Sequence, residues 1–291
     1  MPHITVFRAN MDPPPEDLEF PAGQAVSATL LSGPFEIRFG VPVINQKPPA
    51  ASIFMGERKR VFPQDSYLLI RQEIEPMGLR DELAEALLRV AEISGVFDIR
   101  YPGVLSAKLF EGVVNTPISS SLVLDGPLTL TAQPQRNPSE VATVVSADLA
   151  EVRALRGASR SRFQLASRWY RRGLDTLNLI DRFLSFWTAL EVYPAEGALN
   201  VAAKTRDLLH SKVYPDLPPG VVKERTRIGR IEGLRGKIVH QGKAFVPQIE
   251  EEVFSDLLDR LGLIVRTCLC IAGNLKPDDA LDKYVRERSE I

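Results

Sequence analysis

In the first half of the chain, short hydrophobic runs alternate with polar residues, which is the pattern of half-buried strands. Prolines separate these runs, so the sequence predicts a mostly antiparallel sheet with many turns. The predicted strands are Ile4–Phe7, Val26–Leu31, Phe35–Phe39, Tyr67–Ile74, Val104–Phe110, Ser119–Leu124, Leu128–Thr131 and Val141–Val145.

One helix interrupts the predicted strands. Hydrophobic residues recur at helical spacing between Asp81 and Ser94, and Gly95 follows as an expected stop. A single helix over a mostly antiparallel sheet predicts an α+β domain.

The pattern becomes helical after Val145. Predicted helices cover the stretch around Leu149–Leu155, the stretch around Phe163–Tyr170, Leu177–Glu191, Leu199–Ser211, Val221–His240, Ile249–Gly273 and a last polar turn or two in Pro277–Arg288. The change of period places a domain boundary near residue 150. We therefore expect an α+β domain over 1–150 and an all-α domain over 151–291.

Composition narrows the class of protein. The 291 residues are 44% hydrophobic and 25% charged, with a net charge of −1, which is typical of a soluble globular chain. No apolar run is long enough to span a membrane, and the N-terminus lacks a signal-peptide pattern, so we expect a cytoplasmic protein without membrane partners.

The three histidines and two cysteines show no ligand spacing, and no glycine-rich cofactor motif follows a strand. We therefore expect no metal and no cofactor. Cys268 and Cys270 are expected to be small buried residues.

Basic residues are concentrated locally. Seven arginines and no acid lie between Arg153 and Arg172. Such a face is compatible with binding a phosphate backbone, although a solvated helix surface has the same composition. The candidate nucleic-acid contacts are Arg168, Arg171, Arg172, Arg230 and Lys237.

The candidate chemistry lies in Leu234–His240, where Arg235 precedes His240 by five residues. Arginine can hold a phosphate bidentately, and histidine can move protons near neutral pH, so together they suffice to cut RNA without a metal. On one straight helix these two side chains would point about 140° apart. A two-fold dimer would bring one pair opposite its copy. The competing interpretation is that both residues cap the end of a helix.

Two segments resemble a known superfamily. The stretch Arg182–Glu191 reads RFLSFWTALE, and Leu234–Gly242 reads LRGKIVHQG. In this order and spacing they resemble the HEPN superfamily, specifically its ApeA-like branch, over roughly residues 155–275.

The resemblance implies a bundle of helices that dimerises. It also implies a metal-independent ribonuclease site at the dimer interface. Arg235 would stabilise the charge on the phosphorane, His240 would act as general base or acid at the 2′-hydroxyl, and Glu191 would orient one of them. Glu191 in an ordinary ion pair is the other interpretation. Nuclease members usually carry a polar residue, often Asn or Asp, directly after the arginine, whereas this chain has Gly236.

Two functions therefore stay open. The first is a HEPN-type RNA endonuclease of the defence or toxin kind, in which residues 1–150 sense or regulate. The second is a non-catalytic accessory protein, whose helical half dimerises or binds a nucleotide and whose first half binds an unknown partner.

Overall fold

The computed structural model forms two compact units, Met1–Ala150 and Glu151–Ile291. It describes residues 2–12, 14–22, 25–38, 59–75, 79–113, 137–197, 199–241 and 251–288. The predicted strands Ser119–Leu124 and Leu128–Thr131 lie outside these residues.

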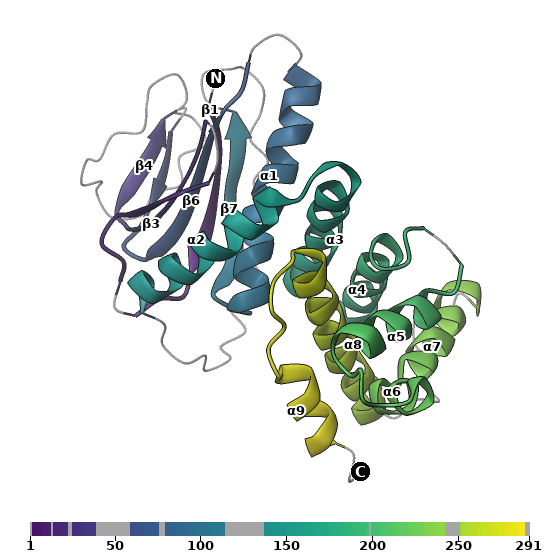
Figure 1. Ribbon diagram of the computed structural model, residues 1–291. Helices are drawn as coiled ribbons and strands as arrows, with labels where there is room; N and C mark the ends of the chain where they lie inside the picture. Colours follow the sequence, from purple (N-terminus) through teal and green to yellow (C-terminus); the bar gives the residue numbers. More distant parts are fainter. Residues whose placement is uncertain are drawn as a thin grey trace. The chain divides into compact units, whose positions relative to one another are not determined.

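Unit 1 is built on a five-stranded antiparallel sheet with strand order β2-β3-β6-β1-β7 (Figure 1). A separate two-stranded ribbon pairs β4 with β5. The strands are β1 (Pro2–Ala9), β2 (Leu18–Pro21), β3 (Val26–Ser32), β4 (Phe35–Arg38), β5 (Lys59–Phe62), β6 (Ser66–Glu73) and β7 (Leu105–Val113). The predicted antiparallel sheet is therefore confirmed, and β2 and β5 are strands that the sequence pattern did not predict.

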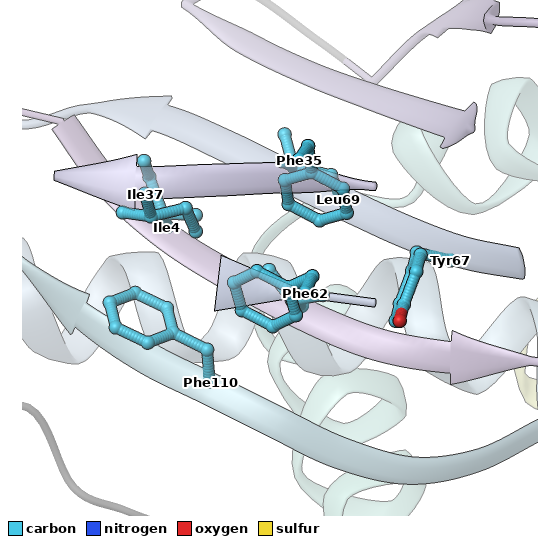
Figure 2. Packing of buried hydrophobic residues seen from close by; sticks show 8 residues of the cluster. Ile4, Phe35, Ile37, Phe62, Tyr67, Leu69 and Phe110 are labelled. Carbon is cyan, nitrogen blue, oxygen red and sulfur yellow. The ribbon is translucent and has the colours of Figure 1, made fainter. Parts of the chain in front are cut away.

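One face of the sheet packs against the β4–β5 ribbon. Figure 2 shows Ile4, Leu69 and Phe110 of the sheet close to the aromatic residues of the ribbon. The rings of Phe35 and Phe62 stack with centroids 4.6 Å apart, and Tyr67 meets Phe35 edge to face at 5.2 Å. Aromatic pairs in these geometries add to the area that they bury. The ribbon thus covers this face of the sheet.

Helix α1 (Leu79–Arg100) covers the opposite face. Phe20 is on that face, because it pairs through Ala28 and Ile70 with Thr5, the neighbour of Ile4. The Phe20 ring lies 6.0 Å from the ring of Phe97 on α1. With both faces covered, β1 and β6 are buried almost continuously rather than at alternate positions.

Two predictions in the first half of the chain were wrong, the end of one helix and one strand. Helix α1 does not stop at Gly95 but continues to Arg100, since residues 91–99 are all buried and that packing outweighs the low helix propensity of glycine. Arg100 then pairs with Asp148, its Nη2 lying 3.0 Å from Oδ1.

The predicted strand Val141–Val145 is instead part of a second helix, α2 (Pro138–Ala154). Asn137 caps its start by accepting from the backbone N–H of Ser139 at 2.9 Å. Its buried residues Val141, Val145, Leu149 and Val152 recur at helical spacing. The β-branched valines favoured a strand, but their spacing was that of a helix.

In the described residues of unit 2, all regular secondary structure is helical. Its helices are α3 (Gly157–Asp175), α4 (Leu179–Val192), α5 (Val201–Lys212), α6 (Pro219–Thr226), α7 (Ile228–Gln241), α8 (Glu251–Ala272) and α9 (Ala280–Glu287). The expected all-α character is confirmed in these residues. The single predicted helix Val221–His240 is two helices, because Arg227 adopts a left-handed conformation with φ of 52° and ends α6.

Helices α3, α4 and α8 meet at Phe186 of α4, which is 4% exposed. A Cβ atom added at Gly173 of α3 would lie 2.5 Å from Cδ1 of Phe186, and one added at Gly262 of α8 would lie 3.2 Å from Cε2. The ring of Tyr170 is 5.4 Å away. The two glycines therefore make the space that the Phe186 ring fills.

Gly173→Ala should lower the free energy of unfolding by about 1–3 kcal/mol, since the added methyl group overpacks against a buried ring. Gly233→Ala on α7 is the matched control, because an added Cβ there meets no atom within 4 Å. It should raise the free energy by about 0.5–1 kcal/mol through helix propensity. Urea unfolding of the three proteins checks this prediction, and equal effects of the two substitutions would contradict it.

His3 of β1 is 1% exposed, and neither ring nitrogen has a hydrogen-bond partner among the described residues. Burial lowers the pKa of His3 below 6.5, while Glu111 opposes that shift and Lys108 adds to it. Below pH 6.5 the unfolded chain therefore binds a proton that the folded chain does not.

As the pH falls below 6.5, the burial of His3 should cost stability, by at most about 1.4 kcal/mol per pH unit. His3→Gln removes this titration, so its free energy of unfolding should fall less than that of the parent between pH 6.5 and 5. Urea unfolding at pH 5, 6.5 and 8 measures the difference. Parallel pH profiles would show that His3 does not titrate differently in the folded chain.

Candidate functional site

Helix α7 carries Arg235 and His240. Its buried residues Ile228, Ile231, Leu234 and Ile238 form one apolar stripe that packs into unit 2. The helix also contains Gly229, Gly233 and Gly236, so its intrinsic propensity is low. Packing of the stripe, rather than propensity, holds α7 in place.

Helix α4 carries Glu191. It begins at an N-cap, Asn178, whose side chain accepts from the backbone N–H groups of Ile180 at 2.9 Å and Asp181 at 3.1 Å. Its apolar face buries Phe183, Phe186 and Leu190. The last turn places Trp187 and Glu191 four residues apart, which puts them side by side on the helix.

The structure brings Arg235 and Glu191 together from helices that are 44 positions apart in the sequence. Nη2 of Arg235 donates to Oε1 of Glu191 at 3.1 Å, and Nε1 of Trp187 donates to the same oxygen at 2.8 Å. The side chains of Arg235 and Glu191 are 31% and 33% exposed. A single oxygen of Glu191 thus accepts hydrogen bonds from both the Trp187 indole and the Arg235 guanidinium at the surface of unit 2.

Trp187 is a member of this site that the sequence analysis did not identify. It lies within the RFLSFWTALE stretch, four residues before Glu191, but a spacing of four occurs many times in every helix and does not indicate a hydrogen bond. The hydrogen bond from the buried Trp187 to a partly exposed carboxylate depends on the tertiary surroundings of both groups.

His240 lies in the last turn of α7, and its side chain is outside the described part of the structure. The pairing of Arg235 with His240 stays a prediction. A Cβ added at Gly236 meets nothing within 4 Å, so a side chain at this position has open space.

The five candidate nucleic-acid contacts divide into two groups. Arg168, Arg172, Arg230 and Lys237 are exposed. Arg171 is 7% exposed and pairs with Asp175 through Nη2–Oδ1 at 2.6 Å and Nε–Oδ2 at 3.0 Å. Its guanidinium is therefore engaged inside unit 2.

A second polar cluster surrounds Asp256 of α8, and the sequence analysis did not predict it. Asp256 contacts Arg260 of its own helix, Arg227 at the start of α7, and Tyr284 of α9. Burial and the negative charge of Asp256 raise the pKa of Tyr284 to about 12, so its hydroxyl stays a donor at neutral pH.

Other chemistries have little support in the described residues. No group of three or more His, Cys, Asp or Glu among them is placed to hold a metal ion. Cys268 and Cys270 are both buried, as predicted, and burial raises the pKa of the Cys268 thiol. Within the described ranges, no helix has the length and apolar character needed to cross a membrane.

Comparison with known proteins identifies no relative: no family model, no curated protein and no solved structure matches this chain.

The site presents the guanidinium of Arg235, oriented by Glu191, at the solvent-exposed surface of unit 2. A guanidinium has five N–H donors, and Glu191 engages one terminal nitrogen of Arg235. An anion that approaches from solvent can bind the other donors or compete with Glu191 for the same one. Arginine suits phosphate in particular, because its planar donors match two phosphate oxygens.

The shared oxygen predicts a spectroscopic signature at the indole N–H of Trp187. Arg235→Ala should strengthen the remaining indole–carboxylate hydrogen bond and move this resonance downfield in a ¹H–¹⁵N spectrum. Glu191→Ala should remove the bond and move the resonance upfield. The chain has two tryptophans, so Trp169→Phe assigns the signal. An unchanged Trp187 resonance in Arg235→Ala would show that the two donors do not share Glu191 in solution.

Proposed function

We propose that this chain is a HEPN-type, metal-independent RNA endonuclease that acts in the cytoplasm as a homodimer of its helical unit. The observation that carries the proposal is the placement of Arg235, which is one-third exposed and oriented by Glu191 at the surface of unit 2. The sequence resemblance assigns the same arginine, with His240, to an RNase site. In this proposal unit 1 senses or regulates.

The proposed reaction uses the 2′-hydroxyl of RNA as nucleophile. Its oxygen forms a bond to phosphorus while the bond from phosphorus to the 5′-oxygen breaks, which leaves a 2′,3′-cyclic phosphate and a 5′-hydroxyl. His240 of one protomer takes the proton of the 2′-hydroxyl, and His240 of the other protomer donates a proton to the departing oxygen. Arg235 stabilises the charge that builds up on the phosphorane oxygens.

Exposed basic residues support binding of the RNA backbone. Arg230 and Lys237 lie seven residues apart on α7, hence on one face, and Gly233 between them leaves that face open. On α3, the guanidinium carbon of Arg172 lies 5.1 Å from the centroid of the Trp169 ring, and Arg168 is exposed nearby in sequence. We leave the buried Arg171 out of the proposed surface.

The same site also favours a second candidate, the non-catalytic accessory protein. Glu191 neutralises part of the charge of Arg235, and Gly236 supplies no polar side chain. A module of this kind would dimerise or bind a nucleotide through the helical unit without cleaving RNA.

An RNase assay in EDTA tests the proposal with a mixed tRNA and mRNA pool. The parent should release fragments that end in 2′,3′-cyclic phosphate, and Arg235→Ala and His240→Ala should each lower the rate at least roughly 100-fold. Arg206→Ala is the matched control: its side chain is 30% exposed and ion-paired with Asp207, and it should leave the rate unchanged. An oligonucleotide with a single ribonucleotide should be cut only after that nucleotide.

A variant that is expected to gain activity provides a second test in the same assay. Gly236→Asn restores the polar residue of the nuclease members at a position where a side chain has open space, and it should raise the rate. If the parent and Gly236→Asn both leave RNA intact while the parent binds a nucleotide or forms a dimer, the accessory function replaces the nuclease.

A further inference from the structure

Asp256 of α8 lies where four helices meet. Its Oδ1 accepts from Nη2 of Arg260 at 3.1 Å and from the hydroxyl of Tyr284 on α9 at 3.2 Å. Its Oδ2 accepts from Nη1 of Arg227 at 3.1 Å. The Asp256 side chain is 10% exposed and that of Arg260 2%. Both carboxylate oxygens are therefore committed to a largely buried network.

The network holds the junction between α6 and α7 at two points. Arg227 links the two helices in a left-handed conformation, with φ of 52°, which is unfavourable for a residue other than glycine. Its side chain is anchored by Asp256. Two residues earlier, the backbone carbonyl of Arg225 accepts from Nη1 of Arg260 at 2.7 Å. Helix α8 thus fixes the place where α7 begins.

The apolar stripe of α7 packs the helix into unit 2, and polar contacts near its start and at Arg235 add to that packing. Three glycines in fourteen residues make it a weak helix by itself. At its start it is held through Arg227, and two turns later it is held by the ion pair of Arg235 with Glu191. Since Arg227 directly precedes the first residue of α7, the first attachment sets the angle at which Arg235 reaches Glu191.

We propose that Asp256 is a positioning residue for Arg235: through Arg227 and Arg260 it fixes the start of α7 and so the direction of the Arg235 guanidinium. Its effect on RNA cleavage rests on the proposed function, whereas its effect on Arg235 does not. Asp256 touches no substrate in this proposal. The competing explanation is that the network stabilises unit 2 without affecting Arg235.

Three variants separate these explanations. Asp256→Asn keeps the size of the side chain and removes its charge. Arg227→Gly removes one ion pair but suits the left-handed backbone and leaves the pair of Asp256 with Arg260 intact. Asp278→Asn is the control, because the Asp278 carboxylate pairs with Arg266 of the same helix α8 and accepts from the backbone N–H of Ala280, away from Arg227 and Arg225 in its hydrogen bonds.

The first readout is the indole N–H resonance of Trp187 in the full chain. It should move downfield in Asp256→Asn and in Arg227→Gly, in the direction given by Arg235→Ala, and it should not move in Asp278→Asn. If neither junction variant moves it, or if the control moves it equally, the positioning role is refuted. Arg227→Gly decides the matter alone if Asp256→Asn does not fold.

The second readout is the RNase assay with Asp256→Asn. A positioning role lowers kcat roughly 10- to 100-fold with little change in KM, since a displaced guanidinium is lost mainly from the transition state. If the parent cleaves no RNA, the nuclease function fails, and the Trp187 resonance still decides whether Asp256 positions Arg235. If the parent cleaves and Asp256→Asn matches it, the positioning role fails and the nuclease function stands.

Discussion

The packing of the Phe186 ring against two helices that lack side chains at the contact is the constraint on which unit 2 depends. Gly173 of α3 and Gly262 of α8 leave room for the ring, and any Cβ at the first position would overlap it. Close packing of this kind is sensitive to a single methyl group. Because Phe186 is adjacent to Trp187 and lies just over one turn before Glu191, the same contact fixes the position of the last turn of α4, which carries the candidate site.

The candidate site joins α4, a well-capped helix, to α7, a helix of low intrinsic propensity. Helix α4 is capped at its start and buried along one face, whereas α7 contains three glycines. An ion pair that is one-third exposed contributes at most about 1 kcal/mol, so burial of Ile231, Leu234 and Ile238 places α7. The pair with Glu191 then sets the direction of the Arg235 guanidinium. In the proposed nuclease, such a modest interaction would let Arg235 exchange the carboxylate for a phosphate.

The basic residues of unit 2 fall into two groups, those buried in ion pairs and those exposed to solvent. Arg171 and Arg260 are buried and paired with carboxylates one turn away, while Arg168, Arg172, Arg230 and Lys237 face solvent. Breaking a buried pair is costly, because the remaining charge is left without a partner. The exposed residues have no such constraint, and they are the ones that the proposed RNA surface uses.

The sequence by itself determined the class of each half and most of its elements. Period-two runs predicted β1, β3, β4, β6 and β7, and helical spacing predicted α4, α5 and α8 to within a few residues. The strands β2 (LEFP) and β5 (KRVF) were missed, since their short sequences show no sustained alternation and each is held by pairing with a neighbouring strand, β3 or β4. Val141–Val145 was assigned to a strand because residue type and spacing disagreed there.

Candidate residues were likewise visible in the sequence, but their relations were not. Arg235 and Glu191 stood out by their motifs, whereas their ion pair joins positions 44 residues apart and needs both helices packed in place. The motif around Trp187 did not show its bond to Glu191, and Asp256 carried no signal at all, because its partners Arg227 and Tyr284 come from outside its own helix. The spacing of apolar residues can be read from the sequence, because it reflects local secondary structure. Burial and ion pairs depend on contacts between distant segments, so only the tertiary structure decides them.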